Sequence, residues 1–179
     1  MNTQTELPTL ADLELRPYLD ENGAIDEDLT KKIGVYAIYD RDRNLQFVGY
    51  SRDINFSLKQ HLVRQPQSCY WLKLQTIDRP SRSILEETRK AWIAENGDIP
   101  VGNQQAETIW TQPIDAKPTM TEEEKAQYNN SEELQQIKLL KKIARRVQAD
   151  IEEQLKQRQV NMDIRFNPKL KEQGLLDLK

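Results

Sequence analysis

The chain has 179 residues, of which 37% are apolar, with a net charge of −3 and a mean hydropathy of −0.82. This length predicts one domain, and the low apolar content indicates that part of the chain lies outside its core. A membrane helix and a secretory signal are not expected, and one cysteine and one histidine exclude an internal disulfide and a metal site rich in those residues.

Charge changes along the chain. Residues 1–30 hold eight acids and one base, residues 31–105 hold twelve bases and eight acids, and residues 106–179 hold thirteen of each. An acidic arm therefore precedes a mildly basic body. A basic body can bind phosphate and an acidic arm can cover or repel it, although ordinary solubility accounts for the same whole-chain charge.

Residues 1–30 are polar and interrupted by prolines and a glycine, but they contain several leucines, which predicts an acidic arm that docks on the body. Two apolar segments, 33–39 and 45–50, are joined by a polar turn and predict a strand hairpin. Asp53 is placed to cap a helix that ends before Pro66, and residues 69–77 predict a third strand.

A second helix is predicted from a capping box of Ser83 and Glu86 to Gly97, which can end it in a left-handed turn. Residues 107–111 predict a short edge strand, and residues 112–121 a proline-containing linker. The side chains of the second helix that are expected to point inward are Ile84, Thr88, Ala91 and Trp92.

Residues 122–158 predict one long amphipathic helix, opened by a capping box of Thr121 and Glu124. Apolar positions three and four residues apart form one stripe along this helix, which is expected to be buried. Residues 159–179 predict a tail with little periodicity. The stripe consists of Leu134, Ile137, Leu140, Ala144, Val147, Ile151 and Leu155.

Three short motifs follow one another in the body. Gly34-Val35-Tyr36 is separated by ten residues from Phe47-Val48-Gly49, and Asn103 closes a later Pro-x-x-Asn element. Together they resemble the GIY-YIG nuclease superfamily, and most closely the amino-terminal domain of plant chloroplast CGFS-type monothiol glutaredoxins and its free-standing cyanobacterial relatives. The resemblance implies that residues 31–111 form an α/β domain with a small, mainly three-stranded sheet flanked by helices. No Cys-Gly-Phe-Ser motif is present, so glutaredoxin activity is not implied.

The resemblance also implies a site. Active members are thought to use a tyrosine as general base, an arginine on the first helix to orient the phosphate, and a glutamate on the second helix to bind a divalent metal. Here Phe47 replaces the second motif's tyrosine, Ser57 stands at the arginine position and Arg89 at the glutamate position. Residues at or beside these positions are the candidates: Tyr36, Tyr50, His61 and Arg52 for catalysis, and Glu86 for Mg or Mn.

Each of these candidates has a structural alternative. Tyr36 is also explained as a core tyrosine with its hydroxyl at the rim, and His61 as a buried histidine on the apolar side of its helix. Glu86 follows a capping serine and suits the positive end of a helix without any metal.

Two groups of basic residues are candidates for nucleic-acid binding, which would be electrostatic and not sequence-specific. A solvated surface explains the same charges. The long helix, which carries the second group, is also the candidate docking element for a protein partner. The groups are Arg41, Arg43, Lys59 and Arg64 in the body, and Lys138, Lys141, Lys142, Arg145 and Arg146 on the long helix.

The departures at Ser57 and Arg89 favour a catalytically degenerate GIY-YIG-like protein that acts in nucleic-acid or protein binding. One alternative is an active, metal-dependent DNA endonuclease. Another is a non-catalytic assembly partner in a photosynthetic cell. The expected compartment is the cytoplasm of a cyanobacterium, or the plastid stroma if a transit peptide has been removed.

Overall fold

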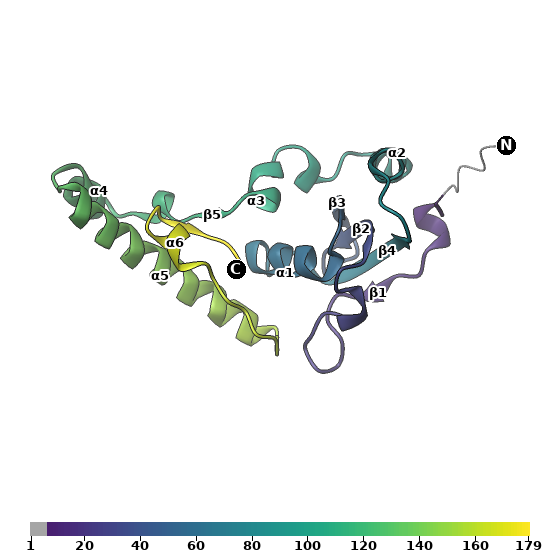
Figure 1. Cartoon of the computed structure of the whole chain (residues 1–179), viewed down its shortest axis with the longest axis horizontal. Coiled ribbons are helices and arrows are strands. Elements are labelled where there is room, and N and C mark those ends of the chain that lie inside the picture. The colour runs from purple at the N-terminus through teal and green to yellow at the C-terminus, as the bar shows by residue number, and fades with distance from the viewer. Residues whose placement is uncertain (1–6) are drawn as a thin grey trace. The chain divides into compact units, whose positions relative to one another are not determined.

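The computed structural model describes residues 7–179 and confirms the predicted α/β class. The chain divides into two compact units, of which the first ends at Thr111 and the second comprises Gln112–Lys179 (Figure 1). No helix among residues 7–179 is both long enough and apolar enough to cross a membrane.

The first unit is built on an antiparallel sheet with the strand order β1-β4-β2-β3. The three main strands, β2 (Ile33–Tyr39), β3 (Leu45–Ser51) and β4 (Trp71–Ile77), agree with the predicted ones to within two residues at each end. The arm adds a fourth edge strand, β1 (Arg16–Pro17), where Arg16 is the register partner of Leu72. A strand of two residues containing a proline has no sequence signal of its own, because Pro lacks the N–H of a regular ladder.

Residues 7–30 pack on this sheet and its helices. Two short 3₁₀ turns, Leu10–Asp12 and Glu27–Leu29, shape the segment. The Glu95 carboxylate accepts hydrogen bonds from the Leu10 and Ala11 amides, and Trp92 Nε1 donates to the Pro8 carbonyl at 3.0 Å. The buried side chains of this segment are Leu10, Tyr18, Ile25 and Leu29. The arm is therefore part of the core of the first unit from residue 7 onward, and residues 1–6 lie outside the described part.

Two helices accompany the sheet. Helix α1 (Ile54–Arg64) begins at the predicted cap, since the Asp53 side chain accepts from the Phe56 amide at 3.1 Å. Helix α2 (Arg82–Asn96) is capped by Ser81, whose hydroxyl accepts from Ile84 N, so the predicted cap at Ser83 is wrong by two residues. Gly97 ends α2 with a φ of +91°, as predicted.

The buried side of α2 differs from the predicted one. Thr88 and Trp92 are buried as expected, but Leu85 is buried in addition and Ala91 is exposed. The two-residue error in the predicted helix start does not explain the difference in the buried side chains, because Thr88 and Trp92, four residues apart, are both buried as predicted. Ala91 carries too little apolar surface to decide which way the helix faces, whereas Leu85 and Trp92 bury the larger area.

The predicted strand at 107–111 is wrong. The 3₁₀ turn Val101–Asn103 is followed by the short helix α3 (Glu107–Thr111), in which the Trp110 amide donates to the Ala106 carbonyl. Trp110 is 2% exposed and stacks on Phe47, with ring centroids 5.4 Å apart and planes at 3°. Burial of this indole outweighs the weak strand preference of a five-residue segment.

The second unit contains two helices where one was predicted. Helix α4 (Glu122–Asn129) and helix α5 (Glu133–Gln157) are separated by residues 130–132. The expected linker contains strand β5 (Ile114–Asp115) and the 3₁₀ turn Lys117–Thr119. The expected tail contains α6 (Pro168–Lys171) and strand β6 (Leu175–Leu176), which pairs with β5 in a second, two-stranded sheet.

The apolar stripe of α5 is partly as predicted. Leu140, Ala144, Ile151 and Leu155 are buried, whereas Leu134 is 66% exposed. Leu139 and Ile143 are buried although they were not assigned to the stripe. The buried face is therefore wider than a single row, as is usual for a helix that covers a small core.

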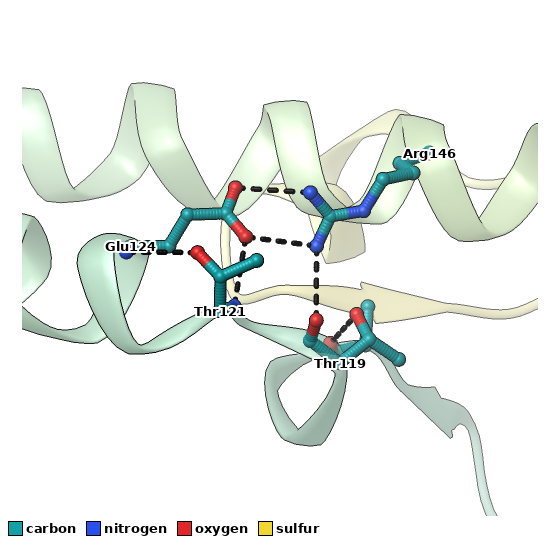
Figure 2. A network of polar contacts seen from close by, with 5 residues as sticks. Thr119, Thr121, Glu124 and Arg146 are labelled. Carbon is teal, nitrogen blue, oxygen red and sulfur yellow. Dashed lines mark hydrogen bonds and ion pairs between the residues drawn. The ribbon is translucent and has the colours of Figure 1, made fainter.

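A network of hydrogen bonds and one ion pair joins α4 to α5 (Figure 2). The Arg146 guanidinium donates to both carboxylate oxygens of Glu124 at 3.0 Å and to the Thr119 carbonyl at 3.1 Å. Glu124 also completes the predicted capping box, because its carboxylate accepts from the Thr121 amide while the Thr121 hydroxyl accepts from the Glu124 amide. The hydrogen bonds from Arg146, followed by that from Thr121, lower the pKa of Glu124 from 4.5 to about 2.

Candidate functional site

Tyr36 lies at the centre of the candidate site. Strand β2 is central in the sheet, and its register sets Tyr36 opposite Gly49 of β3. A Cβ at Gly49 would lie 2.9 Å from the Tyr36 hydroxyl and 2.5 Å from Phe47. The two motifs can therefore pack closely only because this position is a glycine. A pocket of about 290 Å³ opens beside this contact. Its lining consists of Tyr36, Phe47, Gly49, Tyr50, Ser57, Gln60, His61, Arg64, Arg89 and Thr111.

Tyr36 and His61 form a buried hydrogen-bonded pair. The Tyr36 hydroxyl lies 2.8 Å from His61 Nε2, and both residues are less than 5% exposed. Burial, reinforced by the nearby Arg64 charge, lowers the pKa of His61 to about 3, so the imidazole is neutral at physiological pH. Burial also raises the pKa of Tyr36 above its ordinary value of 10.0. The pair is therefore a neutral one, in which the tyrosine keeps its proton at neutral pH.

An aromatic cluster closes the inner side of this pair. Phe47 lies 4.7 Å from the His61 ring, centroid to centroid, and Trp110 lies 5.7 Å from it. The phenyl ring that stands in place of the second motif's tyrosine thus serves packing. The sequence did not predict that Trp110 belongs to this cluster, because residues 107–111 were expected to form a strand. The available signal was the helical spacing of four residues between Ala106 and Trp110.

Glu86, Tyr50 and Arg89 form one polar network at the mouth of the pocket. The Tyr50 hydroxyl donates to Glu86 Oε1 at 2.6 Å, and Arg89 Nη2 donates to Glu86 Oε2 at 3.3 Å. The Arg89 guanidinium also lies over the Tyr50 ring, 5.7 Å from its centroid. The hydrogen bond from Tyr50, assisted by Arg89, lowers the pKa of Glu86, so the carboxylate is ionised and each of its oxygens accepts one hydrogen bond.

The positions expected to hold a metal and to orient a phosphate carry other chemistry. Among residues 7–179 there is no group of three or more His, Cys, Asp or Glu side chains placed to hold a metal ion. The Ser57 hydroxyl donates to Ser51 Oγ at 2.7 Å, which fixes it within the unit. The arginine that lines this pocket from α1 is Arg64, whose Nη1 donates to the Trp110 carbonyl at 3.1 Å.

Arg52 does not line this pocket. It is exposed just before α1 and lines a separate pocket. The structure therefore brings Tyr36, Tyr50 and His61 together with Glu86 nearby, and leaves Arg52 outside. Whether any of them takes part in catalysis stays a prediction.

The closing element of the motif supports the sheet. Asn103 Oδ1 accepts from the Val48 amide and Asn103 Nδ2 donates to the Val48 carbonyl, both at 2.8 Å. Gly34 allows close strand packing, because a Cβ there would lie 2.2 Å from the Gln75 carbonyl oxygen. Val35 and Val48 are fully buried in the same core.

The basic residues predicted to bind nucleic acid fall into two sets with different surroundings. In the first unit, Arg41 and Arg43 are exposed in the β2–β3 turn, Lys59 is half-buried on α1, and the Arg43 guanidinium lies 4.9 Å from the Trp71 ring centroid. In the second unit, Arg146 is held by Glu124, and Lys141 pairs with Glu172 at 3.5 Å. Of the five predicted α5 residues, Lys138, Lys142 and Arg145 form no ion pair among the described residues.

The fold is of the α/β class, and the motif residues that resemble the GIY-YIG superfamily lie together in its first unit. The chain is distantly homologous to the bifunctional monothiol glutaredoxin-S16, chloroplastic, of Arabidopsis thaliana, with 34% identity over 100 residues. The matched region is 54% of this chain but only 32% of that relative, so it spans about a third of the relative's length. No family model matches the chain.

Proposed function

We propose that this chain is a catalytically degenerate GIY-YIG-like protein whose function is binding. The observation that carries the proposal is the pair of contacts that Glu86 makes. Its two oxygens bond Tyr50 and Arg89, and Arg89 stands where the resemblance requires a metal-binding carboxylate. A guanidinium repels a divalent cation, and a carboxylate with a fixed cation beside it has little affinity left for one.

The Tyr36–His61 pair supports the same proposal. A general base must release or accept a proton near the working pH. The pKa of Tyr36 is raised and that of His61 is about 3, so neither group changes its protonation near pH 7. In this proposal the pair acts as a structural element under the pocket.

The partner is proposed to be nucleic acid, bound through phosphate contacts of the exposed cations. Arg41 and Arg43 in the first unit and Lys138, Lys142 and Arg145 in the second are available for such contacts. Contacts to phosphate carry no base information, so binding without sequence preference is expected. A cyanobacterial cytoplasm or a plastid stroma is the proposed compartment, supported by a relative described as chloroplastic.

A plasmid-nicking assay with a parallel metal titration tests the proposal. We expect no nicking of supercoiled plasmid with Mg²⁺ or Mn²⁺, and no saturable Mn²⁺ binding by calorimetry. Robust nicking that is lost in both Tyr36→Phe and Glu86→Ala would establish the alternative, an active endonuclease. Nicking that persists in both variants would identify a contaminating nuclease and leave the chain itself inactive.

A further inference from the structure

A separate pocket of about 270 Å³ shares only Tyr50 with the candidate site. It lies where β3 ends and where α1 and α2 begin. Its lining consists of Ile33, Tyr50, Ser51, Arg52, Pro80, Ser81, Arg82 and Leu85. Two of these side chains are guanidinium groups and none is a carboxylate.

The two arginines are not neutralised within the described part of the chain. No ion pair among residues 7–179 joins Arg52 or Arg82 to an acid. Both side chains belong to exposed residues, so they reach solvent across the pocket mouth. Two unpaired guanidinium groups that line one pocket provide donors and charge for an anion with two negative charges.

Arg82 and Tyr50 line the same pocket, and Arg82 lies near the Tyr50 hydroxyl. That hydroxyl donates its proton to Glu86, which does not itself line the pocket. Arg52, which directly follows β3, completes the cationic side of the pocket.

The rest of the lining is largely apolar. Leu85 is 5% exposed, Ile33 is half-buried, and the Tyr50 ring and Pro80 add further apolar surface. A cationic side beside an apolar surface fits a ligand with a charged head and a flat organic body. An inorganic ion would leave the apolar surface uncovered.

We propose that this pocket binds a phosphate monoester carried on a flat organic group, of the mononucleotide class. The dianionic phosphate lies between Arg52 and Arg82, and the organic group covers Ile33, Leu85 and the Tyr50 ring. This chemistry occurs both in a free nucleoside monophosphate and at the phosphorylated 5′ end of an oligonucleotide. The proposal does not depend on the loss of nuclease activity, because neither Tyr36 nor a metal takes part.

Calorimetric titration of the full chain tests the proposal, with adenosine 5′-monophosphate, adenosine, and a short oligonucleotide with and without a 5′ phosphate as probes. We expect saturable binding of the monophosphate with a Kd below about 1 mM. Adenosine is expected to bind at least about tenfold more weakly, because it lacks the charged hydrogen bonds. Tighter binding of the phosphorylated oligonucleotide than of the free monophosphate would identify the ligand as the 5′ end of a nucleic acid. Tighter binding of the free monophosphate would identify it as a free nucleotide.

Three single variants locate the site. Arg52→Gln and Arg82→Gln each remove one guanidinium and are expected to weaken monophosphate binding about tenfold. Arg79→Gln is the matched control, since Arg79 is an exposed arginine close in sequence that does not line the pocket. Its effect is expected to stay below about twofold. The three arginines are exposed, so the substitutions are not expected to change the fold. Thermal melts of all variants check this.

Two outcomes would overturn the proposal. One is the absence of saturable binding of the monophosphate and of the phosphorylated oligonucleotide at concentrations of about 10 mM. The other is an equal loss of binding in Arg79→Gln and Arg82→Gln, because that would reflect general attraction to a basic surface. Either result leaves the nicking assay and its conclusion unaffected.

Discussion

The side chain of Asn103 binds the backbone of Val48 as a neighbouring strand would. One amide group accepts from the Val48 N–H and donates to the Val48 carbonyl, each at 2.8 Å. Strand β3 stands at the edge of the sheet, where backbone groups otherwise lack a partner. The last residue of the motif therefore closes the edge of the sheet at Val48. It belongs to the 3₁₀ turn that leads to α3.

Asn103→Ala is expected to lower the free energy of unfolding by about 1–3 kcal/mol, because it leaves two backbone groups of β3 unsatisfied. Asn103→Asp keeps the acceptor but loses the donor and is expected to be destabilising as well. Chemical denaturation at pH 7 measures both. Gln104→Ala is the control, since it removes one exposed hydrogen bond to Ile99 and is expected to cost less than about 0.5 kcal/mol. Equal losses in Asn103→Ala and Gln104→Ala would contradict the structural role of Asn103.

The sequence predicted the first unit better than the second. Its three main strands and α1 were placed correctly because each has a continuous apolar run or a distinct cap, such as Asp53. The strand at Arg16–Pro17 and the helix that contains Trp110 were missed. Both depend on partners far away in sequence, Leu72 and Phe47 respectively, and local preference does not report such contacts.

In the second unit, periodicity identified a long helix but not its limits. The predicted helix, 122–158, runs past Asn129, where α4 ends, and its apolar stripe included Leu134, which is 66% exposed. A helical pattern shows which positions share a face, but not how far the covering core extends. The pairing of β5 with β6 joins residues 114–115 to 175–176, and segments of two residues show no alternation.

At the candidate site, the sequence identified which residues depart from the motif, and the structure shows what the replacements do. The exchange at Arg89 was recognised, but its contacts with Glu86 and Tyr50 follow from the packing of α2 beside β3. The pairing of Tyr36 with His61 joins β2 to α1 across 25 residues. No spacing rule predicts such a contact, although the position of His61 on the apolar side of its helix pointed inward.

Gly49→Ala is expected to disrupt the site and the core together. The added methyl group would lie 2.5 Å from Phe47 and 2.9 Å from the Tyr36 hydroxyl, so both rings must move. A crowded core position costs about 1–3 kcal/mol, and the near-ultraviolet circular dichroism of the aromatic cluster is expected to change with it. Gly97→Ala separates crowding from backbone strain. That site is open, but its φ of +91° disfavours a side chain, so we expect about 1 kcal/mol with no change in the aromatic signal. An unchanged melting temperature in Gly49→Ala would show that the two rings are not in contact across this glycine.

Glu124 is expected to make the stability of the second unit depend on acid pH. Its folded pKa of about 2 lies below its ordinary value of 4.5, so its contribution is complete above pH 4.5 and is lost as the pH falls toward 2. In Glu124→Gln this contribution is absent at every pH. Urea midpoints of the two proteins should therefore differ at pH 7 and converge between pH 4.5 and 2. Glu122→Gln is the control, since the Glu122 side chain is 91% exposed and its ion pair with Lys125 contributes little. A constant difference between Glu124→Gln and the parent protein down to pH 2 would contradict the ion pair with Arg146.

The ion pairs of α5 also set how strongly salt should weaken nucleic-acid binding. Five cations lie within nine residues of this helix, but Lys141 and Arg146 are held by Glu172 and Glu124, which leaves Lys138, Lys142 and Arg145 for phosphate. Three contacts from α5 to duplex contribute about −2.7 to the slope of log K against log salt, in addition to the contribution of Arg41 and Arg43, whereas five contacts from α5 would contribute about −4.5. Fluorescence anisotropy with a random duplex across a salt series measures the slope. Replacing the three available residues with glutamine is expected to reduce its magnitude by about 2.7, and Lys125→Gln on α4 is expected to leave it unchanged. An unchanged slope in the variant with the three glutamines would contradict phosphate contacts by α5, and an absence of binding at low salt would shift the proposed function to a protein partner.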